Sequence, residues 1–248
     1  MRSETFAGFD GAALAVHRLG EGRPVILLHG LFSDAQTNWL RFGHAQRLAD
    51  AGFEVVMPDL RAHGQSAKPH EREAYPHDVL VRDAEALVEH LGLHDYDLGG
   101  FSLGARTAVR CVLAGLRPGK LVLGGMGLEG LAGWDRRAAF FIDAIDRFEE
   151  VKHGDPAFMA VAFMKTQKVD RVAARFLLQA VDDTTDEELA GVTMPTLVVC
   201  GEEDRDNGSP QKLVDALPNA TLAETPGTHM SSVTEPALGE ALVRFLTA

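Results

Sequence analysis

Cysteine is scarce in this chain, which has two such residues among 248. Cys111 and Cys200 stand far apart, each inside an apolar run, and neither has histidine neighbours at metal-ligand spacing. This scarcity excludes a disulfide framework and argues against a cysteine-based metal site. We therefore expect two small buried thiols in a protein of a reducing compartment.

Basic charge and long apolar runs are also lacking. Lys and Arg number 24 against 36 Asp and Glu, which gives a formal net charge of −12. Such a chain lacks the basic surface that nucleic acid requires, and anionic membranes repel it. Polar residues interrupt every long apolar run, and residues 1–6 contain no signal-like stretch. We expect a cytoplasmic protein that binds neither nucleic acid nor membrane; its oligomeric state is left open.

The chain does contain a regular alternation of strand and helix patterns. The strand patterns cover residues 6–9, 12–18, 24–28, 53–57, 95–99, 121–123, 196–200 and 221–224. The helical patterns cover residues 38–51, 78–91, 103–116, 210–217 and 236–246. Asp10-Gly11 predicts a two-residue hairpin turn between the first two strands. The alternation predicts an α/β fold, a mostly parallel eight-stranded sheet with helices on both faces.

One interval breaks this alternation. Residues 127–191 carry no strand pattern, and their aromatic residues are spaced among charged ones. We expect a helical cap inserted into a core made of residues 1–126 and 192–248; the alternative is a helical crossover whose aromatics only pack on the core. The candidate substrate-binding residues of this cap are Trp134, Phe140, Phe141 and Phe163.

A candidate nucleophile follows the fifth strand pattern. Residues 100–104 read Gly-Phe-Ser-Leu-Gly, which matches the G-x-S-x-G pattern of a tight strand-to-helix turn. Gly100 and Gly104 remove side chains that would clash in such a turn. The N-terminus of the next helix directs amide dipoles at a developing negative charge. The pattern predicts that Ser102 is a catalytic nucleophile.

A serine nucleophile requires a base. Of the ten histidines, two follow Ser102 in the chain, His153 and His229. His229 comes just after the last strand pattern, so it shares the carboxyl edge of the sheet with Ser102. His153 lies in the expected cap. We expect His229 to be the base.

The base in turn requires an orienting acid, which on this fold falls between the serine and the histidine in chain order. The loop after residues 196–200 carries four carboxylates: Glu202, Glu203, Asp204 and Asp206. Asp204 is preferred, although spacing alone leaves the others open.

The amides that would stabilise an oxyanion come from two turns at the same edge. His29-Gly30-Leu31 follows the third strand pattern, and Leu103 opens the helix after the nucleophile. The backbone N–H groups of Leu31 and Leu103 are expected to form an oxyanion hole. We expect His29 and His63 to brace loops by hydrogen bonds and not to act as bases.

These motifs resemble those of the α/β-hydrolase superfamily over nearly the whole chain. They are, in chain order, His29-Gly30, residues 59–66 with Ala62 in place of the usual Gly, residues 100–104, residues 201–204 and residues 227–229. In the family the acid falls three residues after the glycine, which selects Asp204 here. The resemblance implies a serine hydrolase that needs no metal or other cofactor.

The resemblance also separates branches of the superfamily. Haloalkane dehalogenases and the related epoxide hydrolases carry an aspartate where this chain has Ser102. Metal-free haloperoxidases share Gly100-Phe101-Ser102 but usually have an aromatic residue at Leu31 and often Met at Leu103. We expect a carboxylesterase that cleaves a small or medium apolar ester through an acyl-enzyme. A lactone or a carbon–carbon bond next to a ketone is the alternative substrate, and a ligand-binding protein on the same fold is the alternative role.

Overall fold

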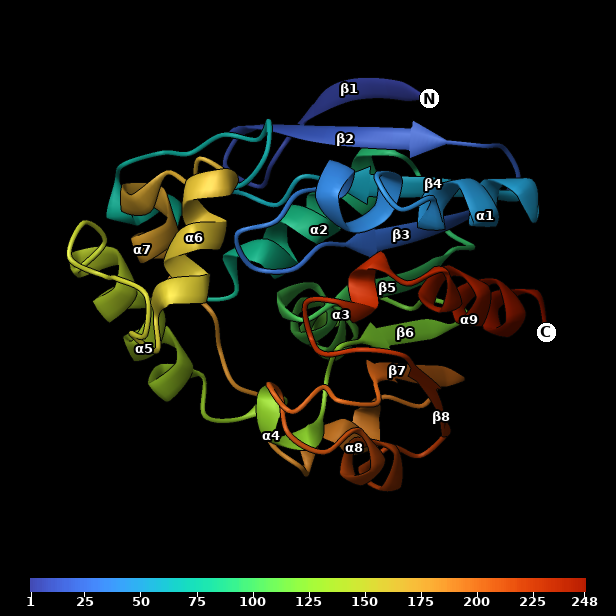
Figure 1. The fold of residues 1–248 in the computed structure, drawn as a ribbon. Coiled ribbons are helices and arrows are strands. Elements are labelled where there is room, and N and C mark those ends of the chain that lie inside the picture. The colour runs from blue at the N-terminus through green and yellow to red at the C-terminus, as the bar shows by residue number, and fades with distance from the viewer.

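The computed structural model describes residues 1–248 and is built on one eight-stranded sheet (Figure 1). The strands are β1 (Arg2–Ala7), β2 (Ala13–Leu19), β3 (Arg23–Leu28), β4 (Phe53–Pro58), β5 (Asp97–Phe101), β6 (Leu121–Gly124), β7 (Thr196–Gly201) and β8 (Ala220–Thr225). Their order across the sheet is β1-β2-β4-β3-β5-β6-β7-β8. Strand β2 pairs antiparallel with β1 and β4, and all other neighbours pair in parallel. The predicted α/β architecture is confirmed.

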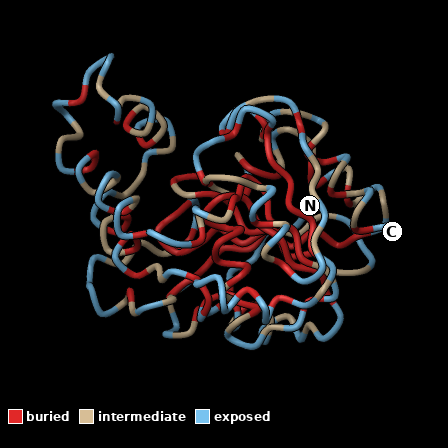
Figure 2. Tube along the Cα trace, turned by 90° about the horizontal axis from the view of Figure 1, so that it is seen from below, coloured by how far each residue is buried: buried red, intermediate tan, exposed pale blue.

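Helices bury both faces of this sheet, which is why its inner strands read as continuous apolar runs. One face packs against α1 (His44–Asp50) and α9 (Pro236–Thr247), and the other against α2 (Val79–His90), α3 (Leu103–Ala114) and α8 (Pro210–Ala216). Successive residues of β3 alternate between the two cores: Val25 and Leu27 join one, and Ile26 and Leu28 join the other. The buried positions accordingly gather along the strands at the centre of the molecule (Figure 2).

Residues 127–191 contain helices and no strand. They form α4 (Leu128–Leu131), α5 (Trp134–Asp146), α6 (Phe158–Thr166), α7 (Arg171–Leu178) and a 3₁₀ turn at Glu188–Gly191. Helices α5, α6 and α7 lie beyond the carboxyl ends of the parallel strands, whereas α4 packs on α8 (Figure 1). Buried residues of α5, α6 and α7 belong to the same hydrophobic cluster as α2 and α3. No helix of the structure combines the length and hydrophobicity needed to cross a membrane.

The first hairpin differs from the sequence-based expectation. Strand β1 begins at Arg2 and ends at Ala7, and five residues connect it to β2. The two-residue turn predicted at Asp10-Gly11 is therefore wrong. Phe6 is the one buried residue of this edge strand, so apolar alternation could not reveal it. Asp10 instead places its carboxylate 2.8 Å from Nη2 of Arg61.

The helix expected over residues 38–51 is two segments. A π-helical turn spans Gln36–Leu40, and α1 begins at His44. Gly43 separates them with a left-handed φ of 77°, a conformation that ends a helix readily only at glycine. This break turns Asn38 and Trp39 inward beside the loop after β3.

Candidate active site

Ser102 occupies the turn between β5 and α3. Its backbone has φ 54° and ψ −112°, a strained conformation for a residue with a side chain. A Cβ at Gly100 would lie 2.3 Å from the carbonyl carbon of Gly104, and one at Gly104 would lie 2.1 Å from the carbonyl oxygen of Leu28. Both glycines are thus required by the close passage of α3 over the turn and over β3. The predicted strand-to-helix turn is present, with its strand two residues later than expected.

Ser102 and His229 lie together, although 127 residues separate them in the chain. Nε2 of His229 is 3.0 Å from Oγ of Ser102, and Nδ1 is 2.8 Å from Oδ2 of Asp204. The imidazole packs against the ring of Phe101, with the centroids 5.1 Å apart. The structure therefore places a continuous hydrogen-bonded chain from carboxylate to imidazole to hydroxyl at the carboxyl edge of the sheet.

Asp204 is the carboxylate that reaches the imidazole. It is 3% exposed, whereas Glu202, Glu203 and Asp206 are exposed. Its Oδ1 accepts the N–H of Asp206 at 3.0 Å, and Oδ2 is occupied by His229. Burial opposes ionisation and is the largest single effect, but the hydrogen bond and charge of His229, the N–H of Asp206 and the charge of Arg137 together outweigh it, so the pKa of Asp204 lies below its ordinary value. An ionised Asp204 holds the His229 ring with Nε2 directed at Ser102. His153 is exposed, in the connection between α5 and α6.

The two expected oxyanion donors border the same small space as Ser102. Leu31, Ser102 and Leu103 line a cavity of about 10 Å³, together with Met126 and Trp134. Leu103 is the first residue of α3, so its N–H has no acceptor within the helix. The N–H of Leu31 has no hydrogen-bond acceptor in the protein. Both amides are therefore free to bind an oxygen of a ligand in this space.

Two buried histidines brace the loops around that space, as the sequence predicts. Nε2 of His29 accepts the N–H of Leu60 at 2.9 Å, and Nε2 of His63 accepts the N–H of Phe32 at 2.9 Å. The Nδ1 atom of each ring lies 2.9 Å from a backbone carbonyl oxygen, to which it donates. Every ring nitrogen is thus committed with the imidazole neutral, which fixes the Leu31 loop against residues 59–66.

A third brace comes from a carboxylate that the motif analysis did not single out. Asp59 accepts the N–H groups of Ala35 at 2.9 Å and of Gln65 at 2.7 Å. It is buried, but His17, these N–H donors and the nearby His29 outweigh the effect of burial and hold the pKa of Asp59 well below its ordinary value. On the other side, Oδ1 of Asn38 accepts the N–H of Gly30 at 3.0 Å. These contacts shape the backbone that carries the Leu31 amide.

The residues expected to bind substrate do not all reach Ser102. Trp134 does, because it borders the space in front of the serine. Phe140 and Phe141 border a larger adjoining hollow of about 470 Å³. Phe163 lines neither space; it is half-buried and packs on the main hydrophobic cluster. Its packing on this cluster is not revealed by sequence spacing.

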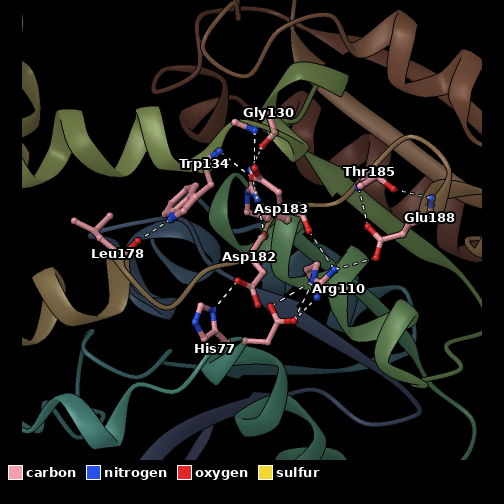
Figure 3. A network of polar contacts seen from close by, with 12 residues as sticks. His77, Arg110, Gly130, Trp134, Leu178, Asp182, Asp183, Thr185 and Glu188 are labelled. Atoms are coloured by element: carbon pink, nitrogen blue, oxygen red, sulfur yellow. Dashed lines mark hydrogen bonds and ion pairs between the residues drawn. The ribbon is translucent and has the colours of Figure 1, made fainter.

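Trp134 is held at both its backbone and its ring (Figure 3). Its N–H donates to Oδ1 of Asp183 at 2.8 Å, and Nε1 donates to the carbonyl oxygen of Leu178 at 2.8 Å. Arg106, one turn beyond Ser102 on α3, donates to the same carboxylate at 3.1 Å and lies 4.9 Å from the Trp134 ring. The first turn of α3 is thus tied directly to residues 134 and 183 of the helical interval.

The sequence of this chain is similar to that of a known protein family. Residues 25–240 match the family described as "Alpha/beta hydrolase family". The chain belongs to the alpha/beta hydrolase family. It is 28% identical over 219 residues to "AB hydrolase superfamily protein YisY" of Bacillus subtilis, an alignment that covers 79% of this chain and 80% of that protein.

Two further likenesses differ in extent. A non-heme haloperoxidase of Rhodococcus erythropolis is 36% identical over 107 residues, which is 42% of this alpha/beta hydrolase and 36% of the relative. A solved hydrolase from Pseudomonas aeruginosa superposes with a TM-score of 0.76 at 24% identity, covering 100% of this chain and 99% of that one. The structural likeness establishes the fold and leaves the substrate to be argued from the site.

Three polar residues of this alpha/beta hydrolase site were missed from the sequence. Arg106, Arg137 and Asn207 all border the space in front of Ser102. Nδ2 of Asn207 donates to the carbonyl oxygen of Gly125 at 2.7 Å, which ties the loop after Asp204 to the end of β6. Arg106 lies one turn after the nucleophile on α3, so helical spacing was a usable signal for it. Arg137 and Asn207 come from separate segments, and no spacing rule connects them to Ser102.

Proposed function

We propose that this alpha/beta hydrolase cleaves carboxylic esters through a covalent acyl-enzyme formed on Ser102. The observation that carries the proposal is the hydrogen-bonded chain of Asp204, His229 and Ser102, with distances of 2.8 and 3.0 Å. A serine activated in this way attacks carbonyl carbon at neutral pH.

Acylation uses the groups around the small cavity. His229 accepts the Ser102 proton at Nε2 as Oγ attacks the ester carbonyl. The amides of Leu31 and Leu103 donate to the developing oxyanion, an effect worth roughly 3 kcal/mol per donor in comparable sites. His229 then protonates the departing alcohol, and the acyl group stays on Ser102.

Deacylation runs the same proton transfers with water. A water molecule gives its proton to Nε2 of His229 and attacks the acyl carbon, and His229 returns the proton to Oγ of Ser102 as the acid leaves. Asp204 stays ionised throughout, because its pKa is depressed. It keeps the Nδ1–H tautomer of His229 and stabilises the imidazolium.

The acyl or alcohol group beside Ser102 is expected to be small or medium and apolar at that point. Leu31, Leu103, Met126 and Trp134 form the apolar part of the lining of a space of about 10 Å³, which Arg106, Arg137 and Asn207 also border. Only a small substrate group fits beside Ser102 without a large movement of these side chains. A longer group would have to extend into the adjoining hollow. We propose such an ester as the small-molecule partner; the cytoplasmic location stays a prediction.

The first experiment labels the nucleophile. A fluorophosphonate probe is expected to modify the wild-type protein at Ser102, to leave Ser102→Ala unlabelled, and to react far more slowly with His229→Ala. Ser3→Ala is the matched control, because Oγ of Ser3 lies 2.8 Å from the His17 ring but does not sit on a strand-to-helix turn. Labelling at another serine, or at none, contradicts the proposal.

The second experiment separates ester hydrolysis from its alternatives. Wild-type protein is assayed against short-chain esters, lactones of matched size and diketones. Turnover of esters that is lost in Ser102→Ala supports the proposal. Activity on lactones or diketones alone assigns the same triad to those bonds. A ligand that binds without turnover, with an affinity that survives Ser102→Ala, supports a binding role for the fold.

A further inference from the structure

The hollow next to Ser102 has an unusual charge for this protein. Its volume is about 470 Å³, and it lies between α5, the α4 turn and the loop at residues 205–208. Its charged lining residues are four arginines and two acids: Arg106, Arg136, Arg137, Arg205, Glu129 and Asp206. The lining therefore carries an excess of two positive charges, whereas the whole chain has a net charge of −12. A concave positive surface in an acidic protein concentrates anions from solution.

Two of these charges are already neutralised by the protein. Arg106 pairs with Asp183 at 3.1 Å, and Glu129 pairs with Lys212 at 2.8 Å. The remaining positive charge lies with the other three arginines. Of these, Arg137 borders both the hollow and the space in front of Ser102, whereas Arg136 and Arg205 border only the hollow.

Arg137 has unused hydrogen-bonding capacity. Its guanidinium is half-buried, and its single hydrogen bond runs from Nη1 to the carbonyl oxygen of Asp206 at 2.9 Å. It forms no ion pair within 4.0 Å, and its ring neighbour is Phe141, 5.7 Å from the guanidinium carbon. A guanidinium has five N–H donors in a planar fork, so most of the donors of Arg137 have no partner in the protein.

Three other arginines hold a carboxylate, which Arg137 does not. Buried Arg61 and Arg106 and half-buried Arg110 each have one within 3.1 Å, and Arg61 has two, although Nε of Arg106 has no hydrogen-bond partner. Removing a guanidinium from water without such a partner is unfavourable. Burial lowers the pKa of Arg137 despite the opposing charges of Asp206 and Asp204, as it lowers that of Arg106 despite Asp183. A bound anion would supply the missing counter-charge.

We propose that this hollow receives a carboxylate group of the substrate and that Arg137 is the residue that binds it. The inference rests on the proposed ester hydrolysis at Ser102 and names its substrate class: an ester with an apolar segment at the reacting carbonyl and a free carboxylate beyond it. A carboxylate fits one guanidinium through two parallel hydrogen bonds. A phosphate dianion fits less well, because the unpaired carboxylate of Asp206 on the same wall would repel its second charge.

The test compares esters that differ only in this charge. On the acyl side, the para-nitrophenyl half-ester of adipic acid is compared with its terminal amide. On the alcohol side, para-acetoxybenzoate is compared with para-acetoxybenzamide. We expect kcat/KM of the wild-type protein to favour the carboxylate form of at least one pair by roughly 10- to 100-fold, the range of a charge-assisted hydrogen-bonded pair.

Substitutions on α5 test whether Arg137 causes the preference for carboxylate esters. In Arg137→Gln the ratio of carboxylate to amide ester is expected to fall to about 1, and Arg137→Lys is expected to recover part of it. The matched comparator is Arg136→Gln on the same helix, which removes the same charge and is expected to change the ratio less than about threefold. Melting temperatures exclude unfolding as the cause.

Failure of this inference can be distinguished from failure of the proposed ester hydrolysis. Esters that are hydrolysed with Ser102 labelled, but with no carboxylate preference in either pair, overturn this inference and leave ester hydrolysis standing. The inference also fails if Arg137→Gln keeps the ratio, or slows both members of a pair by the same factor through the loop of Asp206. Absence of turnover and of Ser102 labelling overturns both proposals.

Discussion

As pH falls, this protein is expected to lose stability before its carboxylates become protonated. His29 and His63 are fully buried and use both ring nitrogens while neutral, with Nε2 of each ring accepting a backbone N–H. A proton on Nε2 would face that N–H directly. Burial therefore lowers the pKa of both rings, that of His63 to about 3.

The sign and size follow from proton linkage. An unfolded histidine has a pKa of about 6.5, so below this pH the unfolded chain binds protons that the two folded rings refuse. Stability is full above pH 6.5 and is lost as pH falls toward the folded pKa. His63 contributes about 1.4 kcal/mol per pH unit between pH 5.5 and 4.5, and His29 adds in the same direction. The buried His44, whose pKa is also lowered, adds in the same direction.

Asp59, Asp204 and His17 act mainly outside this window. Asp59 and Asp204 have depressed pKa values, so the stability they contribute is present above about pH 3.8 and is lost below it. The pKa of His17 is raised, chiefly by its hydrogen bond to Asp59, so its contribution is present below about pH 6.5 and is lost as pH rises through the folded pKa. Neither effect produces the expected slope between pH 5.5 and 4.5.

The assay is urea unfolding at closely spaced pH values, followed by the fluorescence of the buried Trp39 and Trp134. His63→Gln removes one titrating ring and is expected to reduce the slope by about 1.4 kcal/mol per pH unit. His153→Gln, on the exposed cap surface, is the matched control and should keep the wild-type slope. A free energy of unfolding that stays flat from pH 5.5 to 4.5, or an unchanged slope in His63→Gln, would refute the reasoning.

Three further substitutions test the turn and the triad. Asp204→Asn should keep the melting temperature within a few degrees but lower kcat roughly 10³- to 10⁴-fold, because the imidazole loses its orienting anion; near-normal kcat would contradict the role of Asp204. Gly104→Ala should sharply lower the free energy of unfolding, since its Cβ would lie 2.1 Å from the Leu28 carbonyl oxygen. Gly30→Ala should fold, because its Cβ meets nothing closer than 3.5 Å, yet slow acylation by crowding Ser102; unchanged ester turnover would contradict this.

The candidate nucleophile came from a local pattern, whereas the base and the acid needed more. The glycines of residues 100–104 marked the turn, and the shared edge of the parallel strands pointed to His229. Spacing left four carboxylates open, and the family resemblance selected Asp204. Even the departure at Ala62 has a structural counterpart, because its φ of 70° is the left-handed conformation that the usual glycine adopts easily.

The parts that failed depend on contacts between distant segments. The edge strand β1 has no apolar alternation, because one of its faces is exposed to solvent and the other buries only Phe6. Phe163 was assigned to the substrate by type alone, whereas the packing of α6 turns it elsewhere. Arg137 was not predicted as a site residue. Its position between the hollow and Ser102 depends on how α5 packs, which no local pattern in the sequence indicates. The arrangement of residues 127–191, and the pocket that they border, is determined by tertiary contacts and not by local sequence.

The central claim is a covalent acyl group on Ser102, and rapid mixing with a para-nitrophenyl ester tests it most directly. The account predicts an initial release of nitrophenol that approaches one equivalent per protein whenever deacylation is slower than acylation. An acid-quenched sample taken at that time should carry the acyl mass on the peptide that contains Ser102. Full turnover of the ester with no acyl adduct on this peptide, under conditions where Ser102→Ala retains the same rate, would contradict it.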